Sequence, residues 1–166
     1  MAYGNTKPYD REHLGVIRKI RLGIGLAVLL ALTFIFVLGV TAAADGGMAP
    51  DWTRGRPMVY FRLASEYRRG EVVCVRLPDG GAAPRRVVAV AGDTVELRDG
   101  VVIINGIAER GNYSFTRTDP VADGPTYPLL LRQGDYFVLS DRRDVLPDSR
   151  SFGLMVRRDI LGRVLI

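Results

Sequence analysis

The stretch Thr94-Val-Glu-Leu-Arg-Asp-Gly-Val-Val-Ile-Ile-Asn105 decides the fold class of this chain. Two runs rich in apolar and β-branched residues, Thr94–Arg98 and Val101–Asn105, flank the dipeptide Asp99-Gly100. A two-residue type I′ turn needs positive φ at both central positions, and Asp-Gly is among the pairs that adopt it most readily. The stretch therefore predicts a β-hairpin.

The sequence on both sides of this hairpin repeats the pattern of short β-rich runs between turn residues. No helical period longer than two turns is present after residue 44. Residues 106–132 are rich in Gly, Pro, Asn and Asp, which predicts an extended excursion with room for one more strand. This many short strands in about 120 residues predicts a mainly β fold, a compact and partly open antiparallel barrel. The other predicted strands are Met58–Leu63, Glu71–Leu77, Arg86–Val90, Tyr136–Leu139 and Leu161–Ile166.

An apolar run of 23 residues, Leu22–Ala44, precedes the β-rich region. It exceeds the roughly 20 residues that a helix needs to cross a bilayer. The segment before it carries five basic and two acidic residues, so the positive-inside rule places the N-terminus in the cytoplasm. We therefore expect a cytoplasmic segment at 1–21, a single transmembrane anchor helix at 22–44 in the plasma membrane, and an extracytoplasmic β domain at 45–166.

A cleavable secretory signal is the alternative interpretation of the same run. Ala42-Ala43-Ala44 resembles a small-residue cleavage site. Signal-peptide cores usually run about 7–15 residues, and this run is longer, which favours the anchor.

Charge and composition exclude several classes of protein. The net charge is +5, of which +3 lies before the apolar run, and the remainder has 18 Arg against 16 acidic residues. The basic character therefore reflects membrane orientation and lipid contact, and we expect no nucleic-acid partner. The one cysteine, Cys74, lies in a predicted half-buried strand. Without clusters of Cys or His, or a phosphate-binding Gly loop, we expect no metal and no small-molecule cofactor.

Lysine and histidine are confined to the N-terminal segment. Lys7, His13 and Lys19 all precede Leu22, and none of either type follows residue 44. The outer part of the chain thus lacks the two side chains that most often serve as a general base near neutral pH.

Three segments of the outer part resemble signal peptidase I, a membrane serine protease with a lysine base. Gly46–Pro50 resembles the family's Gly-Ser-Met-x-Pro, and Pro84–Val95 resembles its Lys-Arg-Val-x-x-x-x-Gly-Asp run, followed by Asn105-Gly106. Gly134–Gly153 resembles the Gly-Asp-Asn-x-x-x-Ser-x-Asp-Ser-Arg-x-x-Gly box. The resemblance covers nearly all of residues 22–166 and implies a signal-peptidase-like β domain with a peptide groove near the membrane surface.

The departures from the family pattern fall at the catalytic positions. The nucleophile position is Gly47, the base position is Arg85, and the position of the box serine that supports the lysine is Leu146. The opening Gly-Asp-Asn of the box is Ser140-Asp141-Arg142. Three linked changes argue against a single inactivating mutation and favour a natural protein without proteolysis.

The resemblance assigns roles to the other matching residues. It implies a peptide-binding groove at Gly47, Met48, Pro50, Arg85, Ser140 and Asp141. It implies structural support from Arg86, Gly92, Asp93, Asp148, Ser149 and Arg150, with an ion pair between Asp148 and Arg150 beneath the groove. No catalytic residue is expected.

Chemistry supports that expectation. A serine hydroxyl needs a neighbour that accepts its proton, and a buried lysine can do so because its pKa falls. Arginine stays protonated, so Arg85 cannot be the base, and Gly47 has no oxygen with which to attack.

Three functions from different classes remain open on the sequence. The first is a proteolytically dead signal peptidase homologue that binds an extended segment of an exported precursor or a pilin, with a sortase as an associated partner, and assists secretion or pilus assembly as a chaperone. The second is an active type I signal peptidase or conjugative-transfer peptidase that uses non-standard residues, for which the candidates are Asp51, Asp141, Asp144 and Asp148. The third is a structural membrane subunit that binds its partner through the anchor helix or exposed arginines.

Overall fold

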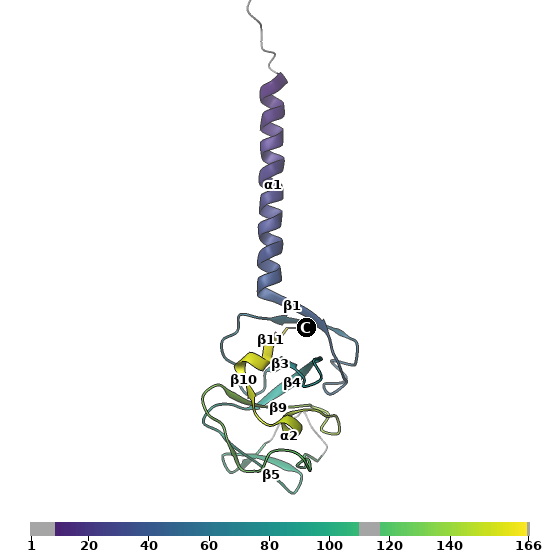
Figure 1. The fold of residues 1–166 in the computed structure, drawn as a ribbon, viewed down its shortest axis with the longest axis vertical. Helices are drawn as coiled ribbons and strands as arrows, with labels where there is room; N and C mark the ends of the chain where they lie inside the picture. The colour runs from purple at the N-terminus through teal and green to yellow at the C-terminus, as the bar shows by residue number, and fades with distance from the viewer. Residues whose placement is uncertain (1–8, 110–116, 166) are drawn as a thin grey trace, which may run out of the picture. The chain divides into compact units, whose positions relative to one another are not determined.

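The computed structural model describes residues 9–109 and 117–165. The chain forms two compact units, residues 1–37 and residues 38–166 (Figure 1). Residues 1–8 of the predicted cytoplasmic segment and Ile166 of the last predicted strand lie outside the described residues.

The first unit is one long helix, α1, at Tyr9–Val37. Its segment Leu14–Val37 has a mean hydropathy of 2.5 and is the one described helix long and apolar enough to cross a membrane. The apolar side chains along this segment, such as Leu22 and Phe36, are exposed. A helix that is apolar and exposed on all sides is typical of a membrane span.

The predicted helix of residues 22–44 is wrong at its C-terminal end. Helix α1 ends at Val37, and Leu38–Ala42 forms the strand β1, which pairs with Pro57–Phe61 (β2) from Leu38–Phe61 to Ala42–Pro57. Gly39 allows this pairing, because a Cβ there would lie 2.1 Å from the Tyr60 ring. Pairing of Ala42, burial of Ala43 and the Ala44 N–H bond to Ala82 O (2.9 Å) integrate the small residues into the β unit. Cleavage after these residues would separate the edge strand β1 from the rest of the β unit.

The second unit contains two antiparallel sheets (Figure 1). The larger sheet has seven strands in the order β1-β2-β11-β3-β4-β9-β10 and stays open, because β1 and β10 are its edges in the described chain. The smaller sheet has the order β7-β6-β5-β8. The prediction of a mainly β, partly open antiparallel fold is confirmed. The remaining strands are Val72–Arg76 (β3), Ala82–Ala89 (β4), Thr94–Arg98 (β5), Val101–Ile104 (β6), Ile107–Ala108 (β7), Leu129–Leu130 (β8), Asp135–Leu139 (β9), Met155–Val156 (β10) and Ile160–Val164 (β11).

The predicted hairpin is present as β5–β6. Arg98 pairs with Val101 across the turn, and Asp99 and Gly100 have φ of 54° and 80°, as a type I′ turn requires. The seven predicted strands all form, with ends that differ by a few residues. The excursion after residue 106 contributes β7 and β8, while β10, the short helix α2 (Ser149–Phe152) and the 3-10 turn Arg157–Asp159 were not predicted.

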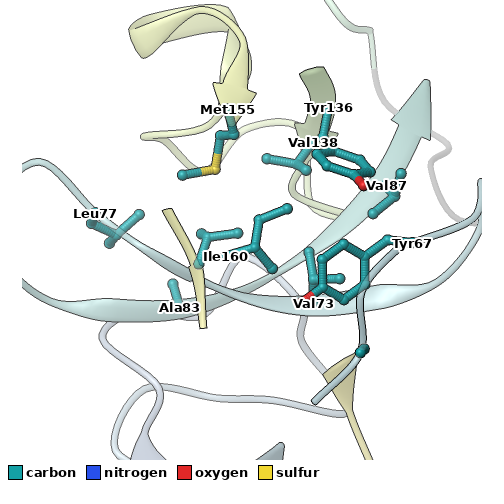
Figure 2. Close-up of a cluster of buried hydrophobic side chains, with 11 residues drawn as sticks. Tyr67, Val73, Leu77, Ala83, Val87, Tyr136, Val138, Met155 and Ile160 are labelled. Carbon is teal, nitrogen blue, oxygen red and sulfur yellow. The ribbon is translucent and has the colours of Figure 1, made fainter. Parts of the chain in front are cut away.

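Three apolar clusters form the core of the described β unit, the smallest of them around Met58, Tyr60 and Cys74. Figure 2 shows the largest one, in which side chains from β3, β4, β9, β10 and β11 converge, including Val73, Val87, Val138 and Ile160. The second cluster, around Phe137 and Leu139, packs the smaller sheet against β4 and β9. Each fully buried aliphatic or aromatic side chain contributes about 1.5–3 kcal/mol relative to exposure. Strand β4 contributes side chains to the first two clusters, which places it in closely packed surroundings.

Candidate functional site

Three segments far apart in the sequence meet beside strand β4. Gly47 lies in the loop between β1 and β2, Arg85 lies on β4, and Ser140 directly follows β9. Because Leu139 pairs with Arg86, the next residue along β9 is brought close to Arg85. A Cβ built on Gly47 would lie 2.7 Å from Ser140 Oγ and 3.1 Å from Arg85 Nη1. The structure thus brings the nucleophile and base positions of the resemblance face to face.

Arg85 is a fully buried cation with all of its nitrogens engaged. Nε and Nη2 donate to Pro147 O (3.1 and 2.7 Å), and Nη1 donates to Pro84 O (2.7 Å). Nη1 and Nη2 also donate to the two oxygens of the Asp45 carboxylate, at 3.1 and 2.6 Å. A buried charge is tolerated when it is paired and hydrogen-bonded, and these contacts fix the guanidinium in place.

Asp45 is the residue that the sequence interpretation missed. Besides pairing with Arg85, its Oδ1 accepts a hydrogen bond from Gly47 N–H (2.8 Å). Burial raises the pKa of the Asp45 carboxyl, but the hydrogen bonds and charge of Arg85 and the Gly47 N–H outweigh this, so the pKa lies below its usual value. An acidic residue two positions before Gly47, together with an arginine where a lysine is expected, is the complementary pair that could have signalled the contact.

Ser140 and Gly47 have complementary sizes. The Ser140 hydroxyl occupies the space into which a side chain at Gly47 would point, at 2.7 Å from the Cβ position. Ser140 is fully buried, and its Oγ has no hydrogen-bond partner among the described protein atoms. The structure therefore accommodates a hydroxyl at position 140 or a side chain at position 47, but not both without a shift.

Comparison with known proteins identifies the family of this chain. The family "Signal peptidase, peptidase S26" matches residues 16–166. The chain belongs to this family. Signal peptidase IB of Staphylococcus aureus is 32% identical over 111 residues, and signal peptidase I of Bacillus licheniformis is 29% identical over 152 residues. The first match spans 58% of this chain and 58% of the relative, and the second spans 82% and 80%.

A solved structure is also similar. Signal peptidase I from Enterococcus faecalis V583 matches 61% of this chain and 98% of the solved chain, with a TM-score of 0.49 and 24% sequence identity.

The other predicted groove residues of this signal peptidase family member surround Gly47 to different degrees. Met48 is buried, and its Sδ lies 3.3 Å from Asp141 N, while Arg142 N–H donates to Gly47 O (2.8 Å). Pro50 is exposed two residues further along the loop. Leu146 is 43% exposed and is not among the atoms nearest to the Gly47 Cβ position; its neighbour Pro147 contacts Arg85 instead.

Two ion-pair clusters flank the site on β4 and the hairpin. Arg86 binds Asp141 through two hydrogen bonds (2.8 and 2.6 Å) and donates to Gly70 O (2.6 Å). Asp93 accepts from Arg69, from Val90 N–H (2.9 Å) and from Asn105 Nδ2 (3.0 Å), in the turn where Gly92 has φ of 89°. These contacts fix β4 against β9 and against β5.

A buried ion pair lies on the other side of Ser140. Asp148 caps helix α2, accepts from Arg150 N–H (3.0 Å), and pairs with Arg150 through its Nε and Nη2 (3.0 and 2.9 Å). Its second oxygen accepts from Ser140 N–H (3.1 Å). Ser149 Oγ accepts from Val138 N–H (2.9 Å). The chain on both sides of the Ser140 hydroxyl is thereby held rigid.

The strands β4 and β1 differ in how many of their backbone N–H and C=O groups near Gly47 already have hydrogen-bond partners. On β4, Ala82 O accepts from Ala44 N–H, Pro84 has no N–H, and Pro84 O accepts from Arg85. Next to β1, the Ala43 N–H donates to Arg56 O (2.9 Å). Backbone N–H and C=O groups alternate in direction along an antiparallel strand, so those of the odd-numbered residues of β1 point toward β2. The backbone groups of Val40 and Ala42 therefore point away from β2. No described strand pairs with this outward edge of β1, where Leu38 O accepts from Arg62 Nε (3.2 Å), while the adjoining part of β4 is already satisfied.

Acid should weaken the Asp45–Arg85 contact. Because the folded-state pKa of Asp45 is lowered, its contribution to stability is present above the unfolded value near 3.8 and is lost as the pH falls through the folded value. We expect Asp45→Asn to lower the melting temperature at neutral pH, with a difference from the wild type that shrinks below pH 3.8 and disappears once Asp45 is protonated in the folded state. Thermal melts of the detergent-solubilised chain across pH measure this difference. Asp51→Asn, at an exposed position of the same loop, is the control; a difference for Asp45→Asn that is independent of pH would contradict the expectation.

Proposed function

We propose that this chain is a proteolytically inactive member of the signal peptidase family that binds an extended segment of an exported protein without cleaving it. The observation that carries the proposal is the Asp45–Arg85 ion pair beside Gly47. It occupies the place where a nucleophile and its base would have to meet.

Acyl transfer needs a nucleophile, a general base and a donor for the oxyanion, and none of the three is available beside Gly47 in the described chain. Gly47 offers no nucleophilic oxygen, and the Arg85 guanidinium stays protonated and is fully hydrogen-bonded. The Gly47 N–H, a donor of the kind that stabilises an oxyanion, is held by the Asp45 carboxylate. The buried Ser140 hydroxyl has no hydrogen-bond partner among the described atoms that could accept its proton, which supports a filling role for Ser140. Peptide binding by strand addition needs none of these groups.

The open edge of β1 supports the binding part of the proposal. Val40 is exposed, and its backbone faces away from β2, so an extended peptide can pair with it. The family relationship supports exported precursors as the partners. In the narrower version of the proposal, the partner is a pilin assembled with a sortase, and the chain acts as a chaperone in secretion or pilus assembly.

We also propose that α1 anchors the chain in the plasma membrane, with its N-terminus in the cytoplasm and the β unit outside. Protease access to residues 38–166 in spheroplasts would test this orientation.

The test measures binding and cleavage on the same precursor peptide. We expect the purified chain in detergent to bind a fluorescent peptide spanning a signal-peptide cleavage site and to leave it intact. Val40→Pro removes one of the outward N–H groups of β1, that of residue 40, and should weaken binding at least about tenfold, because one strand-pairing hydrogen bond is lost and a neighbouring one is displaced. Val40→Thr keeps the N–H and serves as the matched control.

Each other outcome identifies another function. Cleavage by the wild type would overturn the proposal and establish an active peptidase. No binding of any exported precursor would favour a structural membrane subunit.

A further inference from the structure

Two hydrogen-bond donors bind one carboxylate beside β4, and a third, unpaired donor lies next to Gly47. The two donors are the Gly47 N–H and the Arg85 guanidinium, the carboxylate is that of Asp45, and the unpaired donor is the Ser140 hydroxyl. Oδ1 of Asp45 accepts from Gly47 N–H (2.8 Å) and Arg85 Nη1 (3.1 Å), and Oδ2 accepts from Arg85 Nη2 (2.6 Å). A planar guanidinium that binds both oxygens of one carboxylate is the strongest form of this contact in proteins.

The third donor has no partner yet. The Ser140 Oγ is buried and unpaired among the described atoms, and it lies 2.7 Å from the Cβ position of Gly47. Asp45 Oδ1 lies 3.1 Å from that same position. Because a buried hydroxyl without a partner costs free energy, it marks a donor that a slightly different anion position would satisfy.

The cation of the pair is fully buried, whereas the anion is partly exposed to solvent. The side chain of Arg85 is fully buried and is also held by Pro84 O and Pro147 O. The side chain of Asp45 is 20% exposed and is followed by Gly46-Gly47. Solvent therefore reaches the anion side of the pair, and removal of Asp45 would leave a buried charge that needs a new partner.

We propose that Gly47, Arg85 and Ser140 form a carboxylate-binding cradle, that Asp45 is its tethered resident, and that a carboxylate from solvent replaces Asp45 when its side chain is displaced or removed. The external ligands are carboxylates, either small anions such as acetate or the C-terminal carboxylate of a peptide. The cradle is independent of strand addition at β1. As a tethered group acts at an effective concentration of about millimolar or more, Asp45 competes with any free carboxylate in the wild type.

A chemical-rescue experiment tests the cradle on the full chain in detergent. Asp45→Ala empties the cradle, and sodium acetate is titrated against sodium chloride of equal ionic strength. Melting temperature is one readout, and fluorescence of Trp52, the one tryptophan of the sequence, is the other. Trp52 lies beside the site, because its backbone N–H donates to Met48 O (3.0 Å). We expect acetate to raise the melting temperature of Asp45→Ala by about 2–8 °C in a saturable manner. The apparent affinity of this variant for acetate should be at least about tenfold higher than that of the wild type.

Two matched variants separate the cradle from a general effect of acetate. Asp45→Ala/Arg85→Met removes the cation and should lose the response. Asp144→Ala removes the partner of Arg142 from an exposed ion pair and should respond like the wild type. Peptides with a free or an amidated C-terminus then distinguish a terminal carboxylate from a side-chain carboxylate as the ligand.

The decisive comparison is acetate against chloride on folded Asp45→Ala. An equal response to both salts, or an equal response with and without Arg85, would overturn the cradle and leave a purely structural ion pair. If Asp45→Ala does not fold in chloride, recovery of its near-ultraviolet circular dichroism in acetate supports the cradle, and no recovery in acetate overturns it.

Discussion

Substitution of five residues will restore peptidase activity, whereas substitution of the three family positions alone will not. The three-position variant is Gly47→Ser/Arg85→Lys/Leu146→Ser, and the five-position variant adds Asp45→Ala and Ser140→Gly. We expect the five-position variant to cleave a fluorogenic signal-peptide substrate at least about 10³-fold faster than the three-position variant, in detergent at neutral pH.

The reason lies in the contacts around Gly47. A serine side chain at position 47 would meet Ser140 Oγ at 2.7 Å, and glycine at position 140 removes this clash. A lysine at position 85 would pair with Asp45 and stay protonated, because a nearby opposite charge favours the charged form. The Asp45 carboxylate would also keep the Gly47 N–H from an oxyanion, a donor whose loss typically costs about 10²–10³ in rate.

A variant with the other four changes that retains Arg85 is the control, since it has a nucleophile but no base. It should be inactive, as should the wild type. Equal rates for the three- and five-position variants would show that Asp45 and Ser140 do not block the centre. A folded but inactive five-position variant would mean that the groove itself no longer presents a peptide bond.

Asp148→Ala will strongly destabilise the β unit. Asp148 is fully buried, caps α2, pairs with Arg150 and accepts the Ser140 N–H. Removal of one partner from a buried ion pair leaves an uncompensated charge, so we expect a loss of about 3–5 kcal/mol in the free energy of unfolding. Thermal melts of the detergent-solubilised chain, followed by near-ultraviolet circular dichroism, measure the loss.

Asp144→Ala provides the comparison, because it removes an aspartate–arginine pair from the same loop at an exposed position. Exposed ion pairs contribute little, so its melting temperature should stay close to that of the wild type. Similar melting temperatures for the two variants would show that burial of the Asp148–Arg150 pair does not matter. Loss of the Ser140 N–H contact should also loosen the packing of Ser140 against Gly47.

Local chemistry made much of the fold predictable. The β5–β6 hairpin follows from Asp99-Gly100, whose positive φ values are a property of the two residues and their neighbours. The end of α1 at Val37 was not predictable in the same way. Leu38–Ala42 continues the apolar composition of the helix, and only its pairing with β2, more than a dozen residues later in the chain, makes it a strand. Short apolar runs suit a helix or a strand, so the tertiary partner decides.

Some features of the candidate site also follow from residue types alone, whereas others depend on the tertiary structure. The sequence by itself determined that the outer part has no lysine or histidine, that position 47 has no side chain and that position 85 is always charged, since these are properties of residue types. Only the tertiary structure decided that Asp45 binds both Gly47 N–H and Arg85, and that Ser140 occupies the space beside Gly47. Those contacts join a loop, the strand β4 and the segment after β9, and their distances depend on how the sheet packs, which no local pattern encodes.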